Sequence, residues 1–135
     1  WFGTEGGVSR FDGRAFATFP LPAADLSAAP NVNRSPTLIN AIIEDRAGNI
    51  WVGTRGGGLS RISPHGTVPN LGRAEGLPDD SIQALHEDPD GVLWVGTRGG
   101  GLARLDRKAV RVYGRESGLL SLGVRAVVRG PDGAL

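Results

Sequence analysis

The chain has 135 residues, 39% of them hydrophobic, and a formal net charge of +1 at pH 7. That length suits one modest domain, and the near-neutral charge without a Lys/Arg run argues against nucleic-acid binding. The absence of cysteine excludes disulfides, and no apolar stretch approaches the ~18 residues of a membrane-spanning helix. We therefore expect a globular domain with no direct membrane insertion. Because the chain starts at Trp1 and shows no signal peptide, we interpret it as a piece excised from a longer protein.

The chain is built on a nine-residue repeat, Trp-Val-Gly-Thr-Arg-Gly-Gly-Gly-Leu. It occurs at Trp51–Leu59 and Trp94–Leu102, and a looser copy, one residue shorter, opens the chain at Trp1–Val8. The tryptophans are 50 and then 43 residues apart, and periods of about 40–50 residues with strand-like segments indicate propeller blades. The last residues, Asp132–Leu135, match Asp90–Leu93, which directly precede Trp94. The chain therefore begins and ends at the same point of its repeat.

In chain order, the first 37 residues predict a partial blade that lacks its first strand. Runs rich in β-branched and aromatic residues, separated by turn residues, predict its strands at Trp1–Thr4, Val8–Phe11 and Phe16–Phe19. The connector Pro20–Pro36 is longer than its equivalents and rich in Ala, Pro and Asn, so we expect an exposed loop there.

Residues 38–80 and 81–122 predict two complete four-stranded blades, and residues 123–135 predict the first strand of another. The architecture expected from this pattern is all-β, with about three propeller blades per chain and almost no helix. The expected strands are Leu38–Glu44, Ile50–Thr54, Leu59–Ile62, Thr67–Leu71, Ser81–Glu87, Val92–Thr97, Leu102–Leu105, Val110–Tyr113 and Gly123–Arg129.

Trp1, Trp51 and Trp94 occupy the same place in the three repeats, so we interpret them as the main packing residues between blades. Burying one indole removes roughly 150–250 Å² from water. At about 25 cal/mol per Å² this gives an upper bound of about 4–6 kcal/mol. The glycines that follow are interpreted as turn residues rather than a phosphate-binding loop, because no helix follows them.

Ile43–Ile62 and Leu85–Leu105 closely resemble the two-component regulator propeller repeat, with the shared core Trp-Val-Gly-Thr-Arg-Gly-Gly-Gly-Leu. The linking residues Gly76–Ile82 also fit this pattern. The resemblance implies seven-bladed propellers that form the periplasmic or extracellular sensor regions of bacterial receptors, with ligand sensing and frequent dimerisation. It implies no set of catalytic residues and no cofactor.

Three repeats cannot close one ring, so we expect a homo-oligomer joined by strand exchange between chains. In that arrangement Gly123–Arg129 of one chain supplies the first strand of a blade completed by Trp1–Phe19 of another. Two chains would give six blades and three would give nine. The competing interpretation is a fragment of a longer propeller.

The candidate ligand-binding residues lie on the face shared by the glycine turns and the links between blades. The bound molecule would be a small molecule or a glycan, and the alternative is a solvated polar rim. The residues are Glu5, Arg34, Arg55, Asp79, Asp80 and Arg98.

Catalytic and metal sites are not expected. His65 and His86 are the only histidines and are not equivalent in the repeat, whereas a metal site needs several ligands at fixed spacing. The acidic turns at Asp45–Asn49 and Asp88–Gly91 are interpreted as hairpin-turn chemistry rather than calcium loops. Arg10, Arg61 and Arg104, which recur in the third strands, are expected to be structural, with Asp45 and Asp88 as partners.

The sequence thus predicts a non-enzymatic propeller module that binds ligands or acts as an assembly scaffold. One alternative is an excised or engineered fragment that self-assembles without activity. The other is a metal-assisted enzyme, because Trp1–Gly7 and Phe19–Pro22 look similar to the repeats of streptogramin lyases.

Overall fold

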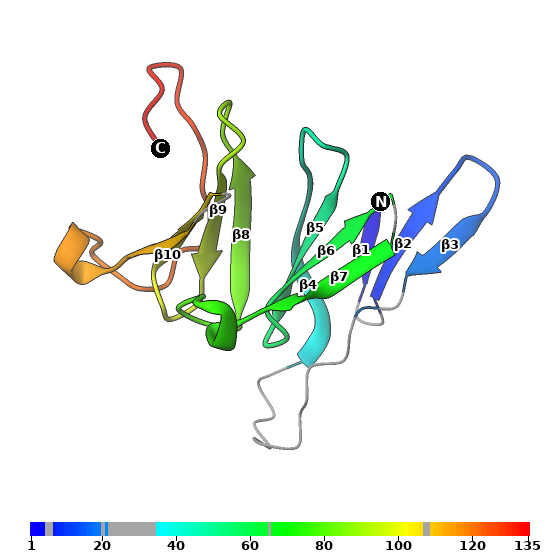
Figure 1. The fold of residues 1–135 in the computed structure, drawn as a ribbon, viewed down its shortest axis with the longest axis horizontal. Helices are drawn as coiled ribbons and strands as arrows, with labels where there is room; N and C mark the ends of the chain where they lie inside the picture. The colour runs from blue at the N-terminus through cyan, green and yellow to red at the C-terminus, as the bar shows by residue number, and fades with distance from the viewer. Residues whose placement is uncertain (5–6, 20, 22–34, 65, 107–108) are drawn as a thin grey trace.

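A computed structural model describes residues 1–4, 7–19, 21, 35–64, 66–106 and 109–135. The chain forms three antiparallel sheets with the strand orders β1-β2-β3, β4-β5-β6-β7 and β11-β10-β9-β8. Figure 1 shows the sheets side by side as a fan, each standing with its face toward the next. This arrangement confirms the predicted all-β fold of propeller blades.

The first sheet contains β1 (Phe2–Thr4), β2 (Gly7–Phe11) and β3 (Phe16–Phe19). Among the described residues this sheet has three strands, and β1 pairs with β2. Most of the predicted connector lies outside the described residues, but its end belongs to β4, which begins at Ser35 rather than at Leu38. Register shifts between Ser35 and Ala41 accommodate this extension.

The second and third sheets are the two complete blades. Their middle strands pair in the same register, with Trp51 opposite Arg61 and Trp94 opposite Arg104. The observed bounds are β4 (Ser35–Glu44), β5 (Ile50–Arg55), β6 (Leu59–Ser63), β7 (Gly66–Leu71), β8 (Ile82–Glu87), β9 (Leu93–Thr97), β10 (Leu102–Leu105) and β11 (Val110–Tyr113).

Each complete sheet is followed by a short 3-10 helix, Arg73–Glu75 after β7 and Arg115–Ser117 after β11. Among the described residues, no helix is long and apolar enough to cross a membrane. The segment 123–129, expected to be a strand, is not assigned as one. A first strand needs the second strand of its own blade as ladder partner, and no described strand occupies that place.

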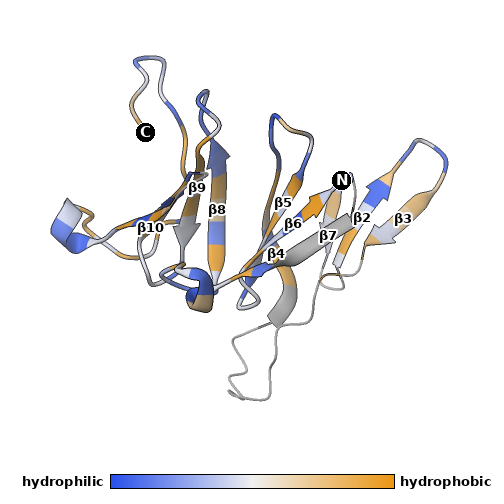
Figure 2. Ribbon diagram, in the orientation of Figure 1, coloured by the Kyte–Doolittle hydropathy of each residue, from blue (hydrophilic) through white to orange (hydrophobic). Residues whose placement is uncertain are grey.

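The hydrophobic core lies between neighbouring sheets. One buried cluster joins Leu59 of the second sheet to Ile82 and Val95 of the third, and Trp51 packs against it. Another joins Val8 of the first sheet to Val52 of the second. Figure 2 shows hydrophobic residues along the strands and mainly hydrophilic residues in the turns that end the hairpins. Blade faces are therefore buried by adjacent blades, as in a propeller.

Polar contacts at the turns add to this packing. The backbone N–H of Arg46 donates to a carboxylate oxygen of Glu87 at 3.0 Å, and the Arg46 guanidinium donates to the carbonyl of Pro89. The turn between β4 and β5 is thereby tied to the turn between β8 and β9. These bonds hold the second and third sheets in a defined relative position.

Candidate functional site

Each complete blade contains a stack of an aspartate, a tryptophan and an arginine side chain, which we call the Asp–Trp–Arg stack. The aspartate lies in the turn before the second strand of the blade. Asp45 accepts hydrogen bonds from the backbone N–H groups of Ala47 and Asn49, at 2.9 and 2.8 Å, and from the Trp51 indole N–H at 2.7 Å. The Arg61 guanidinium lies over the same indole, 5.6 Å from the ring centroid. One carboxylate therefore both shapes the turn and orients the tryptophan.

The third sheet repeats this arrangement. Asp88 accepts from the backbone of Asp90 and Val92 and, at 3.2 Å, from the Trp94 indole N–H, while Arg104 lies 6.0 Å from the Trp94 ring centroid. The aspartates thus meet the tryptophans rather than the arginines, and Arg104 pairs with Asp106 at 2.6 Å. Cation–π stacking and turn chemistry account for these recurring charges.

The pKa values of both turn aspartates lie below their ordinary value. Partial burial raises the pKa of each, but the hydrogen bonds outweigh it: those from Asn49 and Trp51 for Asp45, and those from Val92, Trp94 and Asp90 for Asp88. The charge of Arg129 lowers the pKa of Asp88 further. Hydrogen bonds to an ionised carboxylate favour the charged form, so both groups are anionic near neutral pH.

The repeated nonapeptide is a strand followed by a tight turn. The Thr54 hydroxyl donates to the carbonyl of Gly58 at 3.1 Å and accepts from the N–H of Gly57 at 2.9 Å. Gly58 has φ +79°, and a Cβ there would clash with the carbonyl oxygen of Leu71. Only glycine meets both constraints without strain, so these glycines are structural.

The first glycine of the nonapeptide serves a different purpose, because the next blade packs directly on it. A Cβ on Gly53 would lie 2.5 Å from Ile82, and one on Gly3 would lie 2.6 Å from Ile39. At Gly96 it would lie 2.9 Å from the side chain of Val124, in the C-terminal segment. A glycine against a β-branched residue is therefore the joint between successive repeats.

A small polar hollow of about 290 Å³ lies where the first strands of successive blades run side by side. The Asn40 amide donates to the carbonyl of Ile82 at 2.8 Å, which ties the edge strands β4 and β8 together there. Three of its lining residues are arginines, and among the residues that the structure describes none of the lining side chains is acidic. The lining residues are Asn40, Arg55, Gln83, Arg98 and Arg125.

The structure brings together two of the six predicted ligand-binding residues, Arg55 and Arg98, in this hollow. Glu5 and Arg34 lie outside the described residues. Asp79 and Asp80 instead lie next to Arg73, with nitrogen–oxygen distances of 3.7 and 3.9 Å. They also accept backbone hydrogen bonds from Ser81 and Arg73, so both carboxylates help to form the link between blades.

Sequence reasoning did not single out Asn40, Gln83 and Arg125, although the repeat contained the signal. The three residues occupy equivalent places in β4, in β8 and in the C-terminal segment 123–129, 43 and then 42 residues apart. Asn40 and Gln83 both stand at a register shift of their strand pairing, between Ile39 and Ala41 and between Ile82 and Ala84, and such irregularities redirect a side chain. Had these equivalent positions been considered together with Arg55 and Arg98, the sequence would have indicated the residues that line the hollow.

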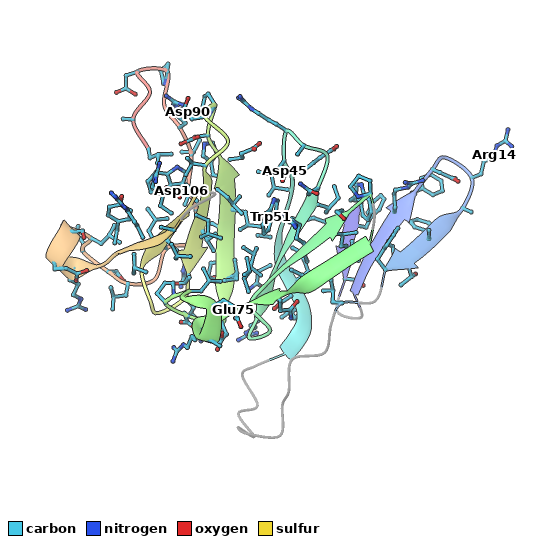
Figure 3. All side chains as sticks on the ribbon, in the orientation of Figure 1. Arg14, Asp45, Trp51, Glu75, Asp90 and Asp106 are labelled. Atoms are coloured by element: carbon cyan, nitrogen blue, oxygen red, sulfur yellow. The ribbon has the colours of Figure 1, made fainter. Side chains whose placement is uncertain are left out.

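A second, larger space of about 950 Å³ opens between the second and third sheets, on the side of the Asp–Trp–Arg stack. Trp51, Arg61 and Asp45 form one wall, and Glu87 and Leu105 contribute to the other. Figure 3 shows Asp45 and Trp51 on the second sheet facing the third, with Asp90 and Asp106 on the opposite sheet. Arg46 bonds across this space to Glu87 and Pro89, and Asp45 is bonded to Asn49 and Trp51. We therefore interpret it as the wedge between diverging blades rather than as the candidate site.

His65 lies outside the described residues, and His86 stands in β8 with its ring atom Nε2 buried. In the part of the chain that the structure describes, no three His, Cys, Asp or Glu side chains are grouped closely enough to hold a metal ion.

Two stretches of the chain match a model of a known repeat family. Residues 33–56 and 76–99 match the family model described as "Two component regulator propeller". These two matches cover the residues from the end of the long connector to Gly56, and from the link between blades to Gly99. No curated protein sequence matches the chain significantly.

Solved structures share the fold. The chain matches the extracellular domain of a hybrid two-component system from B. thetaiotaomicron with a TM-score of 0.73 and 22% identity, covering 98% of this chain and 18% of that one. For the extracellular domain of a one-component system from the same organism the TM-score is 0.72, with 18% identity and coverages of 98% and 20%. The chain thus spans about a fifth of these proteins.

An enzyme shares the fold as well. A catalytically inactive variant of virginiamycin B lyase from Staphylococcus aureus, solved with quinupristin, matches with a TM-score of 0.67 and 17% identity. The match covers 97% of this chain and 41% of the lyase.

Proposed function

Because this chain carries repeats of the two-component regulator propeller family, we propose that it is a non-catalytic, ligand-binding module of an extracytoplasmic bacterial sensor. Two of the similar structures are extracellular domains of one- and two-component systems, which supports a place in the periplasm or outside the cell. The ligand would be a small molecule or a glycan that bears negative charge.

The observation that carries the anionic ligand class is the grouping of Arg55, Arg98 and Arg125 around one hollow. Like charges held together repel one another, and an anion relieves this repulsion while forming charge-assisted hydrogen bonds. Guanidinium groups match carboxylate and sulfate oxygens in pairs. The amides of Asn40 and Gln83 add neutral groups that can bond to hydroxyls, as the remainder of a sugar acid requires.

Calorimetric titration of the chain with a uronic-acid oligosaccharide, a sulfated oligosaccharide and a neutral oligosaccharide tests this function. We expect one of the two anionic probes to bind and the neutral one to fail. The double substitution Arg55→Ala and Arg98→Ala should weaken binding by about tenfold or more, since each charge-assisted hydrogen bond contributes roughly 1.5–3 kcal/mol.

Arg14 provides the matched control, because it is exposed at the tip of the hairpin between β2 and β3, far from the hollow (Figure 3). Arg14→Ala should leave affinity unchanged. Equal binding by wild type and the double variant, or binding of the neutral probe alone, would contradict the proposal. Higher salt should weaken binding, because exposed charges are screened.

The similarity to the lyase supports a second candidate, a metal-assisted enzyme. Elemental analysis of the purified chain separates the two candidates. A divalent metal retained in stoichiometric amount through dialysis would favour the enzyme, and its absence would favour the binding module.

A further inference from the structure

The wedge between the second and third sheets is large enough to hold a ligand beside the residues that bond across it. Its volume of about 950 Å³ falls within the range of ligand pockets, roughly 300–1,000 Å³. Both of its walls belong to complete four-stranded sheets, β4-β5-β6-β7 and β11-β10-β9-β8. The wedge is therefore a feature of two finished blades.

The floor of the wedge is apolar. Trp51 and Leu71 of the second sheet and Leu105 of the third are partly buried and pack against the buried core between the sheets. Val110, on the outer strand β11, also lines the wedge and is 36% exposed. Half-covered apolar side chains in a concave site favour a ligand that removes them from water. The occupant of the wedge therefore needs an apolar body.

The rim of the wedge is mainly acidic. Of the lining residues that the structure describes, five are acidic and two are arginines, an excess of three negative charges. Both arginines already have neutral partners, since Arg61 lies over the Trp51 indole and Arg46 donates to the carbonyl of Pro89. The acidic lining residues are Asp45, Glu75, Glu87, Asp90 and Asp106.

These carboxylates lie at both ends of the apolar floor. Asp45 and Asp90 stand in the hairpin turns that precede β5 and β9, whereas Glu75 lies in the 3-10 helix that follows β7. Figure 3 shows Trp51 between Asp45 and Glu75. The Asp90 carboxylate has no ion pair among the described residues, and Glu75 uses one oxygen for the N–H of Gly72 at 2.6 Å. Both ends therefore keep carboxylate oxygens for a ligand.

We propose that the wedge binds an extended basic peptide segment of a partner protein, with an arginine or lysine toward each end and apolar side chains between them. The apolar side chains cover Trp51, Leu105 and Val110. One basic side chain meets Asp90 and the other meets Glu75. Electrostatic complementarity of this kind selects partners, because an acidic segment is repelled by the same rim.

The pattern of charge favours an extended chain over a small cation. A single ammonium or guanidinium group can pair with the carboxylates at one end of the floor and leaves those at the other end unpaired. An extended peptide presents side chains along its whole length, so it reaches both ends and also covers the apolar residues between them.

The peptide site is separate from the arginine-lined hollow and does not depend on an anion binding there. The hollow is lined by Asn40 of β4 and Gln83 of β8, the first strands of their blades. The floor of the wedge is formed instead by later strands, with Trp51 of β5 and Leu105 of β10. One joint between blades thus offers two sites of opposite charge.

Fluorescence anisotropy with labelled heptapeptides tests the class of ligand. The basic set has arginine at the second and sixth positions and Leu, Ile, Phe or Tyr at the three between. We expect saturable binding by members of this set, and none when glutamate replaces both arginines or serine replaces the apolar residues. Arginine amide should not displace a bound peptide at comparable concentrations.

Two results of this titration overturn the proposal directly. They are failure of every basic peptide to bind, and equal binding by the acidic set. Displacement by arginine amide at peptide concentrations would identify a small cation as the occupant, and this also overturns the peptide assignment.

Charge removal with a matched control tests the site. Glu75→Gln with Asp90→Asn removes one carboxylate from each end, and Glu75→Gln keeps an acceptor for the backbone. Affinity should fall about fivefold or more, because each exposed pair contributes modestly. The control is Glu116→Gln with Asp132→Asn, outside the wedge. Glu116 also accepts from the backbone of its own turn, at 3.1 Å, and Asp132 matches Asp90 in the repeat.

The control double variant carries the same change in net charge and should keep the wild-type affinity. An equal loss in both double variants would show that the net charge of the chain, rather than the wedge, attracts the peptide. Unchanged affinity in both would show that the two carboxylates do not meet it. Either result overturns the proposed site. Arg107 and Lys108, which lie outside the described residues, remain unchanged in every variant.

The tryptophan indole N–H signals in a ¹H–¹⁵N correlation spectrum locate the bound peptide. Trp51 lines the wedge, whereas Trp94, its equivalent in the third sheet, is not among the lining residues. A binding peptide should shift the Trp51 signal and leave that of Trp94 in place, and Trp51→Phe assigns the signal by its loss. A saturating peptide that shifts Trp94 alone, or neither signal, overturns the proposed site.

Discussion

The second sheet and the first sheet are copies of one repeat that experience different surroundings. In the second sheet β5 lies between β4 and β6, and its residue Val52 is fully buried. In the first sheet β1 has one described neighbour, and Phe2, at the same repeat position, is 52% exposed. Nearly the same residues thus give a core strand in one case and an edge strand in the other. Burial in this fold depends on the presence of neighbouring strands as much as on the repeat sequence.

The glycine that closes the nonapeptide turn should show the largest difference between the two sheets. Gly58→Ala forces a side chain into φ +79° and against the Leu71 carbonyl, so we expect a loss of about 3 kcal/mol in the free energy of unfolding. At the equivalent Gly7, with φ +134°, the nearest atom is 3.5 Å from the added Cβ. Chemical denaturation should therefore show a smaller loss, about 1–2 kcal/mol, for Gly7→Ala. Equal losses would contradict the comparison.

Truncation of a core residue sharpens the same comparison. Val52→Ala removes buried methyl groups and should cost about 2 kcal/mol of unfolding free energy. Phe16→Ala in β3 removes a larger ring that is 64% exposed and contacts Phe2 and Phe11, so it should cost less than about 1 kcal/mol. Urea midpoints of both variants measure the difference. If Phe16→Ala lowered the free energy of unfolding more than Val52→Ala, the exposure of the side chain would not determine the loss.

Acid should destabilise the two complete blades through their turn aspartates. The pKa values of Asp45 and Asp88 are lowered in the folded chain from the ordinary 3.8. Their stabilising contribution is therefore present above pH 3.8 and is lost as the pH falls through the folded values. Thermal melts across this pH range should show that the melting temperature falls less steeply with decreasing pH in the Asp45→Asn, Asp88→Asn double variant than in the wild type. A pH profile identical to wild type would show that these carboxylates play no part.

The smallest effect is expected at the link between the second and third blades. Arg73 lies near Asp79 and Asp80, but its side chain is 57% exposed, and exposed ion pairs contribute about 0–1 kcal/mol. Arg73→Ala should therefore change the unfolding free energy by about 0.5 kcal/mol or less. A loss above about 1 kcal/mol would mean that the ion pairs, rather than the backbone bonds to the two aspartates, hold this link.

Most of the fold could be predicted because the repeat displays every local signal more than once. The alternation of strands and the fixed glycine offsets located the strands of both complete blades to within a few residues. The start of β4 was missed because Pro36 argues against a strand, and the register shifts that accommodate it depend on its pairing with β5. The bond between Asp45 and the Trp51 indole was missed because it joins residues six apart across a turn.

The candidate site was predicted in part, for a physical reason. Arg55 and Arg98 were found because they stand inside the repeated nonapeptide. Arg125 was not, because its relation to them depends on the docking of the C-terminal segment against Gly96. Asp79 and Asp80 share a linking segment, and only the path of the backbone shows that they turn toward Arg73. The positions that recur can be read from a sequence more readily than the contacts that their side chains make.

The joint between blades has an evolutionary consequence. A β-branched side chain meets a glycine at each of three successive joints, Ile39 on Gly3, Ile82 on Gly53 and Val124 on Gly96. A tandem duplication of one such unit would therefore insert a blade whose two faces already match its new neighbours. Gain or loss of a repeat can then lengthen or shorten an array without the selection of a new interface.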